Sequence, residues 1–110
     1  HSHLALRYQL EHAKTSGGLE ALVLADDTGM VVASAGDSGV CEELAAVAPL
    51  MGRAPLGMPL PPLLRGAEVA VRALSMNGQD LFLASVGGGM ARDALLSHSM
   101  TGVQRILSAN

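Results

Sequence analysis

Asn77 and Gly78 separate two apolar segments, and this dipeptide restricts the fold more than any other feature of the sequence. An Asn-Gly pair between two strands is the strongest short-range signal for a two-residue hairpin turn. In residues 68–76 ("EVAVRALSM") successive side chains point to alternate faces, one of which is more polar. Residues 80–86 ("DLFLASV") are mostly apolar. The sequence therefore predicts an antiparallel hairpin across 68–86.

A second hairpin is predicted nearer the N-terminus. Residues 19–25 ("LEALVLA") form a nearly continuous apolar run, which is typical of a central strand covered on both faces. The turn "DDTG" follows, because aspartate side chains bind local backbone N–H groups and Gly29 tolerates positive φ. Residues 30–34 ("MVVAS") then form the returning strand.

Amphipathic segments at the two ends predict helices over residues 4–14 and 91–108. In the first helix, Leu4 and Tyr8 are expected beside the apolar stripe of Leu6, Leu10 and Ala13. In the last helix, Gly102 is unfavourable by about 1 kcal/mol relative to alanine, which predicts close packing against another backbone.

A central helix is predicted after the motif "GDSG", residues 36–39. Asp37 or Ser38 is the expected N-cap, since either side chain can accept a hydrogen bond from the first turn. Pro49 lacks an N–H and crowds the carbonyl four residues back, so a kink or an end is predicted near Ala48. The proline-rich segment 54–66 is expected to be a connector.

The order α-β-β-α-β-β-α predicts an α+β fold, with an antiparallel sheet of four to five strands flanked by helices. The 110 residues fit one domain over residues 1–110, and 49% of them are hydrophobic. Tyr8 and Phe82 are the only aromatic residues, so the core must be aliphatic. The opening "HSH", residues 1–3, resembles a tag remnant, which is consistent with a domain excised from a longer protein.

Charge and cysteine content exclude several classes of partner. The formal net charge is −3 with no basic patch, which argues against binding to nucleic acid or to an anionic membrane. No apolar run approaches the roughly 20 residues that span a bilayer. The single cysteine, Cys41, excludes an internal disulfide and fits the cytoplasm. We therefore expect a cytoplasmic protein.

The motif "GDSG" also surrounds the nucleophilic serine of trypsin-like proteases. Those enzymes need two β-barrels of roughly a hundred residues each, more than a single domain of this size holds. A nucleophilic Ser38 would need a histidine base, and outside the tag only His12 and His98 remain, both on predicted helices. A helix start explains every residue of the motif, so we expect no catalytic residue here.

Other candidate sites are weak. Cys41 lies in a first helical turn, where the dipole can lower a thiol pKa, but no resolving cysteine exists and an inert buried thiol is the preferred interpretation. Gly87-Gly88-Gly89 lacks the lysine and the spacing of a phosphate-binding loop. Histidines and carboxylates show no metal-ligand spacing. No cofactor and no metal are expected.

Four stretches together carry a resemblance to a known family: 17–37 ("GGLEALVLADDTGMVVASAGD"), 41–51 ("CEELAAVAPLM"), 76–88 ("MNGQDLFLASVGG") and 102–107 ("GVQRIL"). Over residues 4–108 the chain resembles the Roadblock/LC7 (dynein light chain-type) domain family, especially its bacterial members. The resemblance implies a profilin/Roadblock-like fold. It also implies a homodimer whose sheets join across the interface, with the central helices packed on one side.

Family members commonly bind or regulate Ras-like small GTPases. The resemblance therefore implies a non-enzymatic homodimeric scaffold or regulator that binds a bacterial Ras-like small GTPase. It makes helix 40–51 and strand 68–76 the self-association elements, so charge introduced at Val47 or Ala48 is expected to dissociate the dimer. The implied dimer interface comprises Val40, Leu44, Val47, Ala48, Met51, Val69, Val71 and Ala73.

Two alternatives remain open at this point. A small-molecule sensor of the GAF or PAS type shares the opening order of elements and would have a cavity between sheet and helices. A serine hydrolase built on Ser38 is the third hypothesis.

Overall fold

Two turn sequences organise the strands into the two predicted hairpins. The structure, a computed structural model, describes residues 2–53, 59–88 and 92–108. The elements are α1 (Ser2–Gly17), β1 (Leu19–Asp26), β2 (Val31–Ala35), α2 (Ser38–Arg53), the short 3-10 helix η1 (Pro62–Leu64), β3 (Val69–Met76), β4 (Gln79–Gly87) and α3 (Arg92–Ser108). The predicted α+β order is confirmed. Parts of the predicted connector and of the predicted last helix lie outside the described residues.

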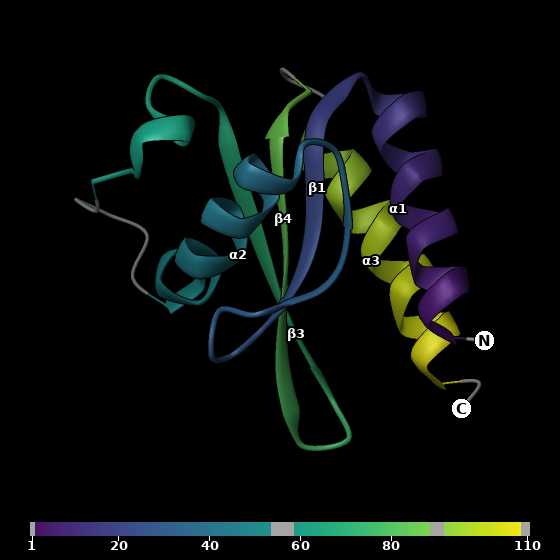
Figure 1. The fold of residues 1–110 in the computed structure, drawn as a ribbon. Coiled ribbons are helices and arrows are strands. Elements are labelled where there is room, and N and C mark those ends of the chain that lie inside the picture. The colour runs from purple at the N-terminus through teal and green to yellow at the C-terminus, as the bar shows by residue number, and fades with distance from the viewer. Residues whose placement is uncertain (1, 54–58, 89–91, 109–110) are drawn as a thin grey trace.

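The described strands form one four-stranded antiparallel sheet in the order β2-β1-β4-β3. Each hairpin is local, and the pairing of β1 with β4 joins the two at the centre of the sheet. Figure 1 shows three layers, with α1 and α3 on one face of the sheet and α2 on the other. Four strands lie at the lower end of the predicted four to five.

Strand β1 is covered on both faces, as predicted. Leu22 and Leu24 belong to the core beneath α1 and α3, whereas Val23 belongs to the core beneath α2. All three side chains are fully buried. This alternation explains the continuous apolar run in the sequence. Phe82 is the only aromatic residue in either core, so the packing is aliphatic as expected.

The second hairpin closes with the predicted two-residue turn. Asn77 and Gly78 have φ values of 54° and 79°, and Met76 pairs with Gln79. Positive φ at both central positions is the geometry that the twist of a hairpin favours, and that an Asn-Gly pair adopts at low energy.

Of the kink or end predicted near Ala48, the end is wrong. Helix α2 continues to Arg53, and Pro49 itself is buried. A proline inside a helix removes one backbone hydrogen bond. The apolar face of α2 packs on the sheet along the helix, and tertiary packing of this kind maintains a helix past a residue with poor propensity.

Two further expectations about the helices are wrong. A Cβ at Gly102 would lie 2.7 Å from Cδ of Gln9, so the close neighbour of α3 is a side chain of α1 and not another backbone. Leu4 and Tyr8 are 62% and 75% exposed, so they lie outside the buried stripe of α1.

The carboxylate of Asp26 organises the first hairpin turn. Its Oδ1 accepts hydrogen bonds from the hydroxyl of Thr28 (2.6 Å) and from the backbone N–H groups of Thr28 (2.9 Å) and Met30 (3.0 Å). These bonds lower the pKa of Asp26 below its ordinary value, and the bond from the Thr28 hydroxyl has the largest effect. Gly29 completes the turn with φ of 84°.

Replacing Asp26 with alanine should therefore destabilise the fold in a pH-dependent way. Because the folded pKa lies below the unfolded value near 3.8, the ionised carboxylate stabilises the fold above about pH 4, and this contribution is lost as the pH falls through the folded pKa. We expect Asp26→Ala to lower the free energy of unfolding at pH 7 by about 1 kcal/mol. Urea denaturation at neutral and strongly acidic pH measures the difference. The exposed neighbour variant Asp27→Ala is the control, and an equal loss at both pH values would contradict this account.

Candidate interaction surface

The motif "GDSG" is the start of α2. Oδ2 of Asp37 accepts a hydrogen bond from the N–H of Val40 (3.0 Å), and the Asp37 carbonyl accepts one from the N–H of Cys41 (2.9 Å). Asp37 is thus the N-cap, and Ser38 is the exposed first residue of the helix. Gly36 has φ of 119°, and a Cβ there would lie 2.8 Å from the carbonyl oxygen of Glu20. The backbone therefore requires this glycine.

The structure does not bring Ser38 together with the two histidines considered as bases. His12 lies on α1 and His98 on α3, and both helices cover the face of the sheet opposite α2. Neither His12 nor His98 can therefore act as a base for Ser38, because a base must lie within hydrogen-bond reach.

Cys41 is a structural thiol. It is 1% exposed, and its Sγ donates a long hydrogen bond to the carbonyl of Ala35 (3.5 Å). Burial raises the pKa of the thiol, which outweighs the lowering effect of a hydrogen bond with Ser34. A protonated, buried thiol is a poor nucleophile, in agreement with the inert interpretation.

Within the part of the chain that the structure describes, no three His, Cys, Asp or Glu residues lie close enough together to hold a metal ion. None of the described helices is both long and apolar enough to cross a membrane. Gly87, the last residue of β4, and Gly88 after it both have positive φ, and Gly89 lies outside the described residues.

The implied interface residues of α2 face the chain's own sheet. Leu44 and Ala48 are fully buried and Val47 is 7% exposed, all in the core beneath α2. Val40, Met51, Val69 and Val71 are partly buried against that same core, and Ala73 is exposed on β3. Charge at Val47 or Ala48 would therefore disturb this core, so such variants do not test self-association specifically.

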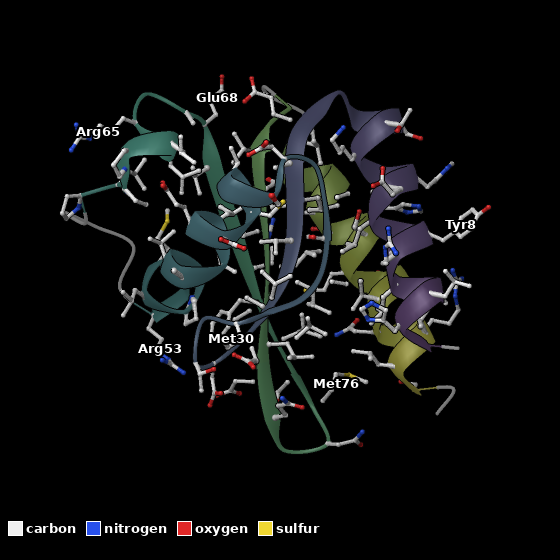
Figure 2. The ribbon with its side chains drawn as sticks, viewed as in Figure 1. Tyr8, Met30, Arg53, Arg65, Glu68 and Met76 are labelled. Carbon is white, nitrogen blue, oxygen red and sulfur yellow. The ribbon has the colours of Figure 1, made fainter. Side chains whose placement is uncertain are left out.

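The outward face of α2 carries a different set of apolar residues. Ala46 is exposed, Leu50 is 53% exposed, and Met30 in the adjoining β1–β2 turn is 65% exposed. The turn packs closely on the helix, since a Cβ at Gly29 would lie 3.2 Å from Cα of Ala46. We call Met30, Ala46 and Leu50 the α2 surface. Figure 2 shows Met30 beside the β1–β2 turn.

Charged residues frame the α2 surface. Glu42 lies in the first turns of α2, where it lines a groove of about 350 Å³ with Gly29, Met30 and Val31. Arg53 ends the helix, and its guanidinium lies over the ring of Phe82, 5.4 Å from the centroid. Glu42, Ala46 and Leu50 are spaced four residues apart. The sequence contains this second helical stripe. The implied interface, however, was assigned to the more apolar stripe on the other side of the helix.

The two edges of the sheet differ. Strand β3 pairs with β4 through eight consecutive residue pairs, without a break in register. Strand β2 has five residues, and its pairing with β1 shifts register between Leu24 and Ala25, which leaves Val32 as an extra, bulged residue. Bulges and short strands limit edge pairing, so β3 is the longer and more regular edge.

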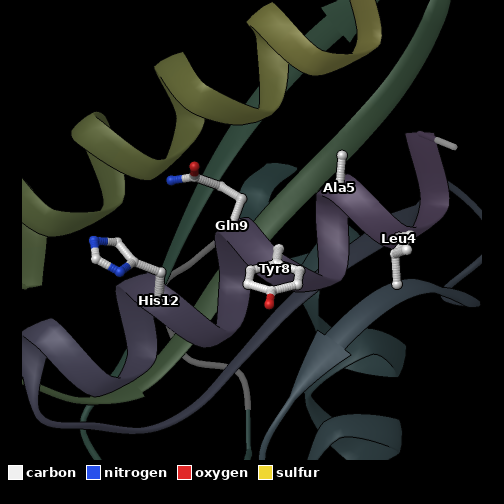
Figure 3. A pocket seen from close by; sticks show the side chains of 5 residues that line it. All are labelled: Leu4, Ala5, Tyr8, Gln9 and His12. Carbon is white, nitrogen blue, oxygen red and sulfur yellow. The ribbon is translucent and has the colours of Figure 1, made fainter.

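The outer face of α1 is a further exposed surface. A shallow groove of about 560 Å³ runs along it, lined by Leu4, Ala5, Tyr8, Gln9 and His12. Figure 3 shows Gln9 directed toward α3, whereas Leu4 and Tyr8 point away from that helix. The grooves described here lie on outer surfaces, and aliphatic side chains fill the layers between sheet and helices. Among the described residues, none of these grooves lies in the layer between sheet and helices where a sensor domain would hold its ligand.

Comparison with solved structures identifies the architecture. The structure of Myxococcus xanthus MglB matches with a TM-score of 0.60 and 13% sequence identity, over 97% of this chain and 87% of that chain. The fold is Roadblock-like. No protein-family model matches the chain, and no curated protein matches it in sequence. Likeness at this level of identity concerns the fold, so function has to be argued from the surfaces.

The helix-start interpretation of "GDSG" predicts effects of different size at two neighbouring residues. Asp37→Ala removes the cap and should lower the free energy of unfolding by about 1 kcal/mol. Ser38→Ala should change it by less than about 0.5 kcal/mol, because Ser38 is exposed. Denaturant titration of both variants measures the contrast. A larger loss from Ser38→Ala than from Asp37→Ala would contradict the assignment of the cap.

Proposed function

We propose that the chain is a non-enzymatic homodimeric scaffold or regulator that binds a bacterial Ras-like small GTPase in the cytoplasm. The observation that carries the proposal is the exposed α2 surface, on a fold of the Roadblock type. The GTPase as a partner class comes from the family resemblance of the sequence. No cofactor has a role in this function.

The α2 surface has the composition of a protein interface. Its centre consists of Met30, Ala46 and Leu50, and charged residues lie at its two ends. An apolar centre with a polar rim is the usual anatomy of such surfaces. Ala46 permits close approach of another helix, and the flexible Met30 side chain can adapt to different partners.

Self-association would combine the outward face of α2 with the β3 edge. Val69 and Val71 pack against the core beneath α2, so alternate residues of β3, Ala73 included, lie on the α2 side of the sheet. Glu42 near the start of α2 and Arg53 at its end favour antiparallel packing with a second copy, because opposite charges then approach each other. This assignment keeps the β3 residues of the implied interface and replaces the buried α2 residues with Ala46 and Leu50.

Leu50→Asp should dissociate the dimer without unfolding the chain. Leu50 is half exposed, so the free energy of unfolding of the monomer should change by less than about 0.5 kcal/mol. An aspartate buried without a partner in an interface is strongly unfavourable. Light scattering on a size-exclusion column should show a mass near twice 11.2 kDa for the unmodified chain and near 11.2 kDa for the variant, at low micromolar concentration.

The matched control is Leu4→Asp, since Leu4 is 62% exposed but lies on α1, on the opposite face of the sheet from α2. This variant should keep the mass of the unmodified chain. A monomeric unmodified chain, or a dimer that survives Leu50→Asp, would refute this interface.

The partner is tested with a panel of bacterial Ras-like GTPases, each loaded with GDP or with a non-hydrolysable GTP analogue. We expect at least one to bind in a nucleotide-dependent manner by isothermal titration calorimetry, and Met30→Asp to weaken that binding about tenfold or more. Leu4→Asp should leave the affinity unchanged. If no member of the panel binds, the GTPase part of the proposal fails, whereas the mass measurement still decides the dimer.

A further inference from the structure

The outer face of α1 and the adjoining edge of β2 form one continuous surface that the proposed function does not use. A groove of about 390 Å³ lies between them, lined by His3, Arg7 and Glu11 of α1 together with residues 31–34 and 36. A smaller groove of about 230 Å³ continues it, lined by Leu4, Arg7, Tyr8 and Glu11. Leu4 and Tyr8 are among the most exposed large hydrophobic side chains of the described chain. We call this region the α1–β2 surface.

The charges of this surface are self-complementary. Arg7 and Glu11 are both exposed and one helical turn apart, and no ion pair joins them among the described contacts. Arginine before glutamate is the weaker order for pairing within a helix, so both charges remain available to a partner. Two such surfaces related by a two-fold axis can place each Arg7 opposite the partner's Glu11.

The directions of the elements produce this arrangement. Helix α1 reverses into β1 at Gly18, and β1 is antiparallel to β2, so α1 and β2 run in the same direction. Antiparallel pairing of two β2 edges would therefore set the two copies of α1 antiparallel on the same face of a continuous sheet. The N-terminal half of each α1, with Arg7, would then face the C-terminal half of the other, with Glu11.

The spacing also fits. Helix α1 packs over β1 and β2 alike, so its axis lies about half a strand spacing inside β2. Across a β2–β2 pair, the two copies of α1 would be separated by about two strand spacings, or roughly 9–10 Å. This separation matches the distance of about 8–10 Å between packed helices. Leu4 and Tyr8 would supply the apolar contact between the helices.

We propose that the α1–β2 surface is a second self-association site, whose occupant is another copy of this chain in antiparallel orientation. The bulge at Val32 restricts regular pairing to Ala33–Ala35, so the association is weak and depends on the contacts of α1. Because β2 and β3 are opposite edges of the sheet, contacts through both would join copies into an open chain. The site does not require the interface of the proposed function.

Charge reversal tests the proposal, and each variant is made together with Leu50→Asp so that the α2 surface is disabled. Arg7→Glu or Glu11→Arg replaces two attractive pairs with two repulsive ones, and should weaken self-association about tenfold or more. The double variant R7E/E11R should restore it. A mixture of the two single variants should also associate, because each supplies the charges that the other lacks. Sedimentation equilibrium from low micromolar to millimolar protein measures these constants.

Arg65→Glu is the matched control, since it makes the same change of charge at an exposed residue far from Tyr8 (Figure 2). Its self-association should equal that of the parent. Tyr8→Ser should weaken association without changing the charge, because it removes an apolar contact. Circular dichroism confirms that each variant is folded.

Three results would overturn the proposal: a parent that stays monomeric at millimolar concentration, single reversals that associate like the parent, or a double variant that is not restored. If the parent stays monomeric, the groove would instead suit an extended segment of another protein. The proposed function fails separately, when the unmodified chain shows no dimer that Leu50→Asp disrupts at low micromolar concentration.

Discussion

The pairing of β1 with β4 is the contact on which the rest of the structure depends. Each hairpin forms from neighbouring segments, but only this pairing joins the two into one sheet. It places β1 in the interior, where residues 21–25 are at most 1% exposed. Both faces of a strand buried in this way must be covered, so the fold needs helices on both sides. The same pairing leaves β2 and β3 as edges, which is why the candidate contacts lie at opposite ends of the sheet.

The sequence predicts the hairpins correctly because their determinants are local. The Asn77-Gly78 turn and the Asp26 turn each depend on backbone conformations and hydrogen bonds within a few residues. The cap at Asp37 is equally local. The end of α2 is different, because burial on the sheet keeps the helix intact past Pro49. Packing against residues distant in the sequence decides where α2 ends, so no local sequence pattern predicts it.

The same limitation explains the interface assignment. On a helix with apolar residues on two stripes, periodicity shows that two faces exist but not which one the sheet covers. The richer stripe of α2, with Leu44 and Ala48, is the one that the chain buries, and the sparser stripe with Ala46 and Leu50 remains outside. On α1 the pattern likewise placed Tyr8 beside the apolar stripe, although Tyr8 is 75% exposed. Only the position of the sheet separates core from surface in both helices.

The likeness to MglB at 13% identity has a related physical basis. A core of leucine, valine and alanine tolerates exchange among aliphatic residues, provided that volume and pattern are kept. The fold can therefore persist while little of the sequence does. Core packing does not constrain the outward residues. Substitutions there can therefore change what the surface binds without changing the fold. Arg7 and Leu50 lie outside both buried clusters. Association through either surface can therefore be changed by substitution while the β1–β4 pairing, and with it the fold, stays intact.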